Sequence, residues 1–234
     1  MSSPEPERKA PIAVALDTSS LPLACQWALQ VAPFVRAVKV GLELYLRHGT
    51  PGVAMIREAA PDCLLFLDLK LHDIPATVAG AARSVAGLEP DYLTVHASGG
   101  ASMVTAAAEA LPKTRVAAVT VLTSLSPADL MALGLGQTPE HLAVAWAQMA
   151  VAAGARAVVS SPREVRALRE RLGAGPQLVT PGVRPHGSGA DDQRRVSTPE
   201  SALAAGADLL VIGRPITGAS DVGAAAAAIA ASVS

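Results

Sequence analysis

Aromatic residues and cysteines are scarce in this sequence of 234 residues, and neither sign of charge is in clear excess. Aromatic side chains make up 3% of the chain, whereas 50% of it is hydrophobic, so the core must be built from alanine, valine and leucine. Lysine and arginine together number 19 against 20 acidic residues. This balance gives no electrostatic footprint for nucleic acid or an anionic membrane. Any anionic ligand must therefore be met by a local site in one large globular domain.

The sequence contains two cysteines and no long apolar run. Cys25 and Cys63 are far apart and lack the spacing of Cys/His metal ligands, so we interpret them as reduced core residues and expect a cytoplasmic location. No stretch reaches the roughly 18 charge-free apolar residues of a membrane span. Residues 1–10 carry proline and mixed charge without the apolar segment of a signal peptide, which predicts a flexible N-terminal tail.

Short runs rich in apolar and β-branched residues alternate with segments of helical periodicity. There are eight runs, at residues 12–17, 37–41, 64–70, 91–97, 115–122, 156–161, 177–183 and 208–214. The helical segments between them include 21–34, 43–58, 77–88, 139–153 and 162–172. An alanine-rich stretch near the C-terminus predicts a packed last helix.

This alternation favours a parallel sheet, and eight repeats favour a closed one. We therefore predict an α/β fold, a single-domain (β/α)8 TIM barrel over residues 11–234. No G-x-G-x-x-G follows the first run, so the main sequence sign of a dinucleotide-binding fold is missing. P-loop and H-E-x-x-H patterns are also absent.

Polar residues collect where the predicted strands end. In a (β/α)8 barrel the active site lies at the C-terminal ends of the strands. The residues in or directly after the runs are Asp17, Lys39, Asp68, Lys70, His96, Thr123, Pro181, Gly182, Gly213 and Arg214. The sequence therefore predicts an active site at one rim of the barrel.

Several of these residues also have a simpler structural interpretation. Asp17 could cap the helix that follows it, His72 and His96 could be structural histidines, and Thr123 could start a turn. Arg214 taken alone could be a surface charge. Its place directly after a glycine at the end of an apolar strand is typical of a phosphate-binding residue.

The segment FLDLKLHDIP, residues 66–75, places three charges in a run that otherwise reads as a buried strand. A structural salt bridge needs one acid and one base and gains little net stability when it is buried. Asp68, Lys70 and Asp73 together exceed that need. We therefore predict that these charges serve chemistry.

The segment 181–196 is a long polar connection with three glycines after the seventh run. It could be a disordered surface loop. Its position instead suggests a mobile lid, in which Arg184 and Gln193 reach an anion and glycine supplies hinge freedom.

The motifs resemble those of the orotidine 5'-phosphate decarboxylase family from Ile12 onward. The family's D-x-K-x-x-D signature stands at residues 68–73, followed by Ile-Pro and, after Ala76, by Thr77-Val78. Many members carry asparagine in place of Ala76, and we expect the local loss of one hydrogen bond there. The other family segments, in order, are VALD at 14–17, VKVG at 38–41, TVHASGG at 94–100, LTS at 122–124, PGVR at 181–184, DDQRRV at 191–196 and VIGR at 211–214.

The resemblance implies decarboxylation of orotidine 5'-monophosphate to uridine 5'-monophosphate and CO2, the last step of de novo pyrimidine nucleotide synthesis. It implies no cofactor, no metal, and a homodimer in which Asp73 and Thr77 enter the neighbour's site. Lys39, Asp68, Lys70 and the partner's Asp73 would form an alternating charge array. The implied substrate contacts are Asp17 and Lys39 to the ribose, Thr123 to the pyrimidine, and Arg184, Gln193, Gly213 and Arg214 to the phosphate.

Two alternatives remain open from the residues. A magnesium-dependent sugar-phosphate decarboxylase of the same barrel superfamily shares the D-x-K-x-x-D strand, but those relatives place a carboxylate on the second strand where this sequence has Lys39. A non-catalytic nucleotide-binding barrel is the other alternative. The presence of all four charged positions argues against it.

Overall fold

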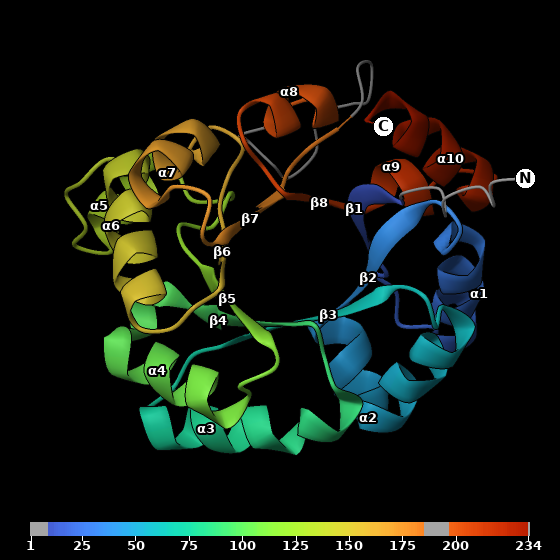
Figure 1. Cartoon of the computed structure of the whole chain (residues 1–234), viewed down its shortest axis with the longest axis horizontal. Coiled ribbons are helices and arrows are strands. Elements are labelled where there is room, and N and C mark those ends of the chain that lie inside the picture. Colours follow the sequence, from blue (N-terminus) through green and yellow to red (C-terminus); the bar gives the residue numbers. More distant parts are fainter. Residues whose placement is uncertain (1–8, 185–196, 234) are drawn as a thin grey trace, which may run out of the picture.

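A closed barrel of eight parallel strands forms the centre of the protein (Figure 1). The computed structural model describes residues 9–184 and 197–233. Neighbouring strands pair in sequence order, and β8 closes the barrel against β1. This confirms the predicted (β/α)8 fold. The strands are β1 Ala10–Ala15, β2 Val35–Gly41, β3 Leu64–Leu71, β4 Tyr92–His96, β5 Arg115–Val119, β6 Ala157–Val159, β7 Gln177–Pro181 and β8 Leu209–Ile212.

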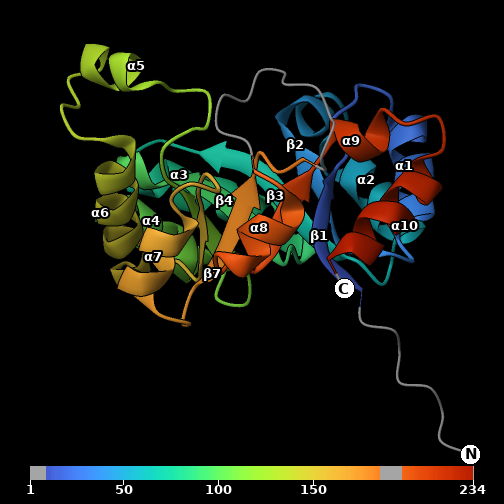
Figure 2. The same ribbon diagram turned by 90° about the horizontal axis from the view of Figure 1, so that it is seen from above.

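Helices surround the barrel as an outer ring (Figure 1). They are α1 Leu21–Val31, α2 Leu42–Ala59, α3 Pro75–Ser84, α4 Ala101–Ala110, α5 Pro127–Ala132, α6 Pro139–Ala152, α7 Val165–Leu172, α8 Pro199–Ala204, α9 Arg214–Thr217 and α10 Val222–Ser232. The last of these confirms the predicted alanine-rich C-terminal helix. Short α5 stands clear of the ring beside α6 (Figure 2). None of the helices in the described ranges has both the length and the apolarity needed to cross a membrane.

Local sequence signals fix where several helices begin. The side chain of Thr138 accepts a hydrogen bond from a backbone N–H in the first turn of α6, and Pro139 follows it at the first helical position. Ser20 caps α1 in the same way. Asp17 therefore does not cap this helix, and its interpretation as a cap is wrong.

Two layers of apolar side chains hold the barrel together. Inside it, four alanines leave room for Phe66 and Tyr92, whose rings stack with centroids 5.1 Å apart. Outside it, a larger cluster of mainly alanine, valine and leucine packs the strands against the helices. Because side chains alternate along a strand, the residues two positions after Phe66 and Tyr92, Asp68 and Thr94, also point inward.

Some sequence predictions need adjustment. Strand β1 begins at Ala10, so this residue belongs to the barrel and not to the predicted tail; residues 1–8 lie outside the described range. Both cysteines are free thiols, Cys63 buried and Cys25 partly buried.

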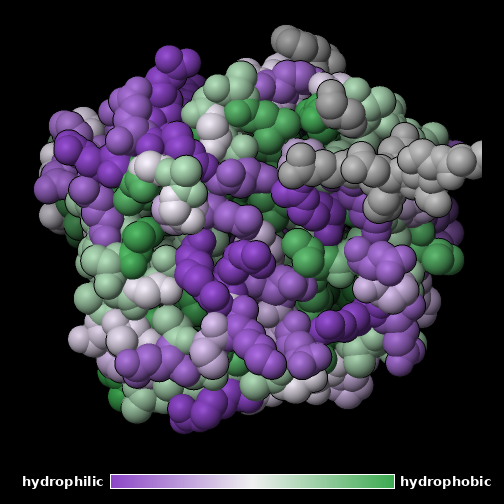
Figure 3. Space-filling view, in the orientation of Figure 1, coloured by the Kyte–Doolittle hydropathy of each residue, from purple (hydrophilic) through white to green (hydrophobic). Residues whose placement is uncertain are grey.

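On the face seen in Figure 1, hydrophobic residues are dispersed in small groups among hydrophilic ones (Figure 3).

Candidate active site

A cavity of about 340 Å³ opens at the C-terminal ends of the strands. Its size suits a small ligand, and it lies where (β/α)8 barrels carry their active sites. Most of the residues predicted from the sequence line it. They are Asp17, Lys39, Asp68, Lys70, Thr123, Arg184, Gly213 and Arg214.

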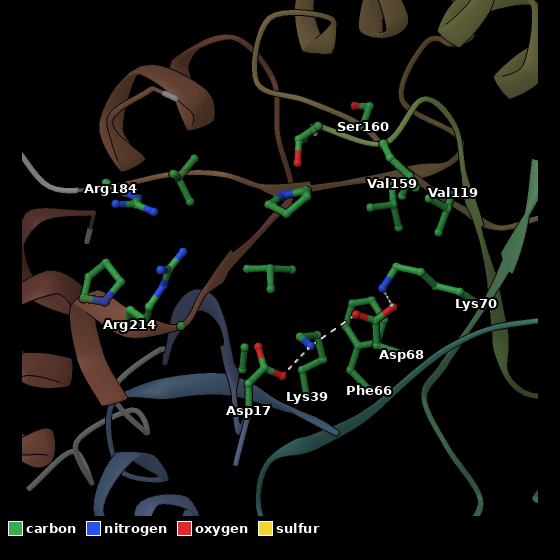
Figure 4. Close-up of a pocket in the computed structure, with 18 of the residues that line it drawn as sticks. Asp17, Lys39, Phe66, Asp68, Lys70, Val119, Val159, Ser160, Arg184 and Arg214 are labelled. Atoms are coloured by element: carbon green, nitrogen blue, oxygen red, sulfur yellow. Dashed lines mark hydrogen bonds and ion pairs between the residues drawn. The ribbon is translucent and has the colours of Figure 1, made fainter. Parts of the chain in front are cut away.

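Four of these side chains form a row of alternating charge (Figure 4). Lys39 Nζ lies 3.2 Å from Asp17 Oδ1 and 3.1 Å from Asp68 Oδ2. Lys70 Nζ lies 2.8 Å from Asp68 Oδ1. Asp68 is thus held between two ammonium groups, and Lys70 stands at the end of the row, partly exposed to the cavity.

The charges in the row sustain one another. Burial alone would raise the pKa of Asp68, but Lys39 and Lys70 outweigh it and hold that pKa below its usual range. Burial alone would lower the pKa of Lys39, yet the carboxylates of Asp68 and Asp17 raise it. Asp68 and Lys39 are therefore charged at neutral pH although both are buried.

An irregularity in β3 shapes the end of the row. Leu67 pairs with Leu93 and Leu71 pairs with Val95, so β3 uses two more residues than β4 over the same stretch. Lys70 lies in this bulge with a φ of 46°, in the left-handed region that residues other than glycine seldom adopt. Bulges next to active sites commonly re-aim a side chain, and here Lys70 points back toward Asp68.

Thr94 contacts two residues of the cavity, and our sequence analysis missed it. It accepts a hydrogen bond from the Lys70 backbone N–H at 2.8 Å, and its hydroxyl donates to Asp68 Oδ1 at 3.0 Å. The signal that could have revealed it is its inward position on β4, two residues before His96. The bulge that brings Lys70 to it depends on pairing between strands.

The other end of the cavity is cationic. Arg184 and Arg214 lie on the side of the pocket opposite Lys70 and Asp68 (Figure 4). Arg214 is the first residue of α9, directly after Gly213. Arg184 follows β7, is buried, and is held through its backbone N–H by the carbonyl of Ser197.

An apolar wall adjoins the lysine end of the pocket. Phe66, Val119 and Val159 line the cavity near Lys70 and Asp68 (Figure 4). The cavity therefore combines a fixed row of charges, an apolar wall beside it, and two arginines across from it. Such an arrangement has the geometry to stabilise charge that develops near Lys70 and to bind an anion at the far end.

Some predicted residues do not line this cavity. Asp73 and Thr77 are exposed, and the carboxylate of Asp73 accepts a hydrogen bond from the next backbone N–H. Ala76 is exposed in the first turn of α3. Gln193 lies outside the described residues.

His72 and His96 lie beside the row of charges, with ring centroids 5.4 Å apart. Burial lowers the pKa of His96, and the neighbouring His72 and Lys70 lower it further, against an opposing effect of Asp68. Within residues 9–184 and 197–233, no group of three or more His, Cys, Asp or Glu side chains is arranged to hold a metal ion.

The chain is similar to known proteins over nearly its whole length. The orotidine 5'-phosphate decarboxylase / HUMPS family matches residues 10–229. The chain belongs to this family. A relative from Thermobifida fusca (strain YX), named orotidine 5'-phosphate decarboxylase, is 62% identical over 222 residues, which cover 95% of each chain. A relative of the same name from Frankia casuarinae is 52% identical and covers 98% of this chain and 89% of its own.

Solved structures of the family have the same architecture. Orotidine 5'-phosphate decarboxylase from Lactobacillus acidophilus superposes with a TM-score of 0.80 at 34% identity, covering 94% of this chain and 97% of that one. The enzyme of this name from Pyrococcus horikoshii OT3 gives 0.79 at 27% identity, covering 95% and 98%. Both solved structures therefore share this barrel over nearly the whole chain.

Proposed function

We propose that this protein decarboxylates orotidine 5'-monophosphate to uridine 5'-monophosphate and CO2, the last step of de novo pyrimidine nucleotide synthesis. The observation that carries the proposal is the alternating row that ends in Lys70, set across one cavity from Arg184 and Arg214. The substrate has matching polarity, with a phosphate at one end and a carboxylated ring at the other. The names of the relatives from Thermobifida fusca and Frankia casuarinae support the same reaction.

The chemistry demands electrostatic stabilisation near the ring. When the bond between C6 and the carboxylate breaks, its electron pair stays on C6 in the plane of the ring, where the π-system cannot delocalise it. An ammonium about 4 Å from that charge contributes roughly 4 kcal/mol at an effective dielectric constant near 20. Lys70 supplies this ammonium and then transfers its proton to C6. CO2 leaves as a neutral molecule.

Asp68 acts on both the lysine and the substrate. Its carboxylate holds the Lys70 ammonium at 2.8 Å, and the proposed pose brings it near the substrate carboxylate. Repulsion between these two anions falls as neutral CO2 forms, which favours the transition state over the bound substrate. The apolar wall of Phe66, Val119 and Val159 suits a neutral product better than an anion.

The remaining contacts bind the nucleotide. Asp17 and Lys39 hold the ribose hydroxyls, and Thr123 holds the pyrimidine. The phosphate binds Gly213 and Arg214, with Arg184 nearby and Gln193 as a further ligand. Loops after the seventh and eighth strands form phosphate sites in many (β/α)8 barrels, and binding energy from this remote group can order the reacting end.

The working unit in this proposal is a homodimer. Asp73 and Thr77 do not line the cavity of their own chain. They complete the charge array and the substrate contacts of the neighbouring chain's cavity. Their exposure supports this role, as does the exposure of Ile74 between them, at 66% for an apolar side chain. A two-fold dimer places the same patch of each subunit at the interface and so forms two shared sites.

The reaction needs neither metal nor cofactor in this proposal, because the charges of Lys39, Asp68 and Lys70 supply the stabilisation. We place the enzyme in the cytoplasm, which the free thiols of Cys25 and Cys63 support. Lys39 also favours this reaction over a magnesium-dependent one. Its ammonium stands on β2 against Asp68, where it opposes a bound cation.

A direct assay tests the proposal. Purified protein, treated exhaustively with a chelator, is added to orotidine 5'-monophosphate while ultraviolet absorbance follows substrate loss and chromatography identifies the product. We expect full turnover to uridine 5'-monophosphate. Activity that vanishes with chelator and returns with magnesium would favour the sugar-phosphate chemistry, and absence of turnover under all conditions would contradict the proposed reaction.

A further inference from the structure

Thr94 joins the two groups on which the proposed chemistry depends. It lies on β4, is 1% exposed, and is not among the residues that line the cavity. Its side-chain oxygen accepts from the Lys70 backbone N–H at 2.8 Å, while its hydroxyl donates to Asp68 Oδ1 at 3.0 Å. The same Asp68 oxygen receives the Lys70 ammonium at 2.8 Å. The Thr94 hydroxyl thus contacts both the backbone of Lys70 and the carboxylate of Asp68.

The direction of each hydrogen bond around Thr94 is fixed by its partner. A backbone N–H can only donate, so the Thr94 oxygen must accept from Lys70. An ionised carboxylate can only accept, so the single hydroxyl proton of Thr94 must point to Asp68. Asp68 then receives Lys70 and Thr94 on one oxygen and Lys39 on the other.

The backbone of Lys70 needs this support. With a φ of 46° in the β3 bulge, Lys70 pays a conformational cost that the surroundings must offset. The register shift takes this residue out of regular pairing with β4, and the Thr94 side chain satisfies its N–H instead. Without a hydroxyl at position 94, this N–H would lose the partner that holds the bulge against β4.

We infer that Thr94 is a positioning residue, which sets the direction of the Lys70 ammonium by tying both the Lys70 backbone and the Asp68 carboxylate to β4. This inference rests on the proposed decarboxylation. It goes beyond the predicted site residues because Thr94 acts through Lys70 and Asp68. Its loss should lower turnover while substrate binding at the arginine end persists, because preorganised charges act on the transition state.

The test compares three variants. Thr94→Val has nearly the same shape but no hydroxyl, and Thr94→Ser keeps the hydroxyl. Thr120→Val is the matched control, because Thr120 is also buried, at 2%, but its hydroxyl donates to the backbone carbonyl of Val159. Thermal unfolding of all three variants separates changed stability from changed chemistry.

We expect Thr94→Val to lower kcat about 10- to 100-fold, the effect of losing a hydrogen bond to a charged group, with little change in KM. Thr94→Ser should retain most of kcat. Thr120→Val should keep wild-type kinetics while it loses about as much stability as Thr94→Val. Equal kcat values for Thr94→Val and Thr94→Ser, beside an active wild type, would overturn the inference alone. A wild type without turnover would overturn the proposed function and this inference together.

Discussion

Lys70 carries two duties in the proposed reaction, stabilising charge on C6 and donating the proton. Lys70→Ala should therefore lower kcat by at least about a thousandfold, the equivalent of roughly 4 kcal/mol. Lys113→Ala removes an exposed lysine outside the cavity and serves as the control. Turnover of Lys70→Ala within tenfold of wild type, measured with about the same folded fraction, would remove Lys70 from the chemistry.

Arg214 can be tested with a substrate that lacks the phosphate. Arg214→Ala should reduce kcat/KM for orotidine 5'-monophosphate about 10- to 100-fold, because a charge-assisted contact to the phosphate is lost. Phosphate-free orotidine should react equally with the variant and the wild type. Arg171→Ala, an exposed arginine on α7, is the control. An equal loss with both substrates would show that Arg214 acts on something other than phosphate.

His96 gives the stability of the fold a pH dependence with a definite sign. Its pKa is lowered in the folded protein, first by burial and then by His72 and Lys70. The unfolded chain therefore binds a proton first as pH falls. The stability that neutral His96 contributes to the fold is fully present above the unfolded-state pKa of about 6.5. It is lost as pH falls from there through the pKa of the folded protein.

The free energy of unfolding, measured by urea titration at several pH values, should show this loss in the wild type. His96→Asn should give a flatter curve over the same pH window. His141→Asn, which changes an exposed histidine of α6, should keep the wild-type slope. Equal slopes for the wild type and His96→Asn would show that His96 is not the source of this pH dependence.

The strands were predictable because each is a short, nearly continuous apolar run, as expected for parallel strands covered on both faces. Their ends were less so: the run predicted at 115–122 forms a strand only over Arg115–Val119. The short helices α5, α8 and α9 span at most six residues, too few for helical periodicity to emerge. The bulge in β3 was not predictable from one strand, because it arises from register against β4.

Most of the candidate site followed from one rule, that polar residues at strand ends meet at one rim. That rule brought Lys39, Asp68 and Arg214 together although they are far apart in sequence. It missed Thr94, since a threonine inside an apolar strand is an ordinary strand residue. Its importance depends on contacts that the bulge creates.

Helix α2 contains a break that local sequence explains. Gly49 has φ 60° and ψ −160°, and Pro51 follows it within the helix. Side chains other than hydrogen rarely allow this backbone conformation, so Gly49→Ala should destabilise the protein by about 1–3 kcal/mol. The added Cβ would meet Pro51 Cδ at an ordinary 3.6 Å, so the cost comes from the backbone.

Gly80→Ala is the matched control for this prediction. Gly80 lies inside α3, where an added Cβ has its nearest neighbour 4.0 Å away. The substitution should stabilise the protein by about 0.4–1 kcal/mol, because alanine restricts the unfolded chain. Thermal or urea unfolding measures both variants. The same sign for the two substitutions would contradict the proposed strain at Gly49.

The whole enzyme, in the proposed function, is a pair of chains that share their sites. In that proposal, each cavity uses its own Lys70 and the partner's Asp73. Lys70→Ala and Asp73→Asn homodimers should both be severely impaired, because each lacks one member of the charge array at both sites. A heterodimer of the two variants would carry both changes in one site and neither change in the other.

Mixing these two inactive proteins under conditions of subunit exchange tests the central claim most directly. Turnover of orotidine 5'-monophosphate is measured against mixing ratio, with each variant alone as control and exchange verified by differently tagged chains. Sharing predicts recovery of about half of wild-type turnover per heterodimer. No recovery despite demonstrated exchange would contradict a site built from Lys70 of one chain and Asp73 of the other.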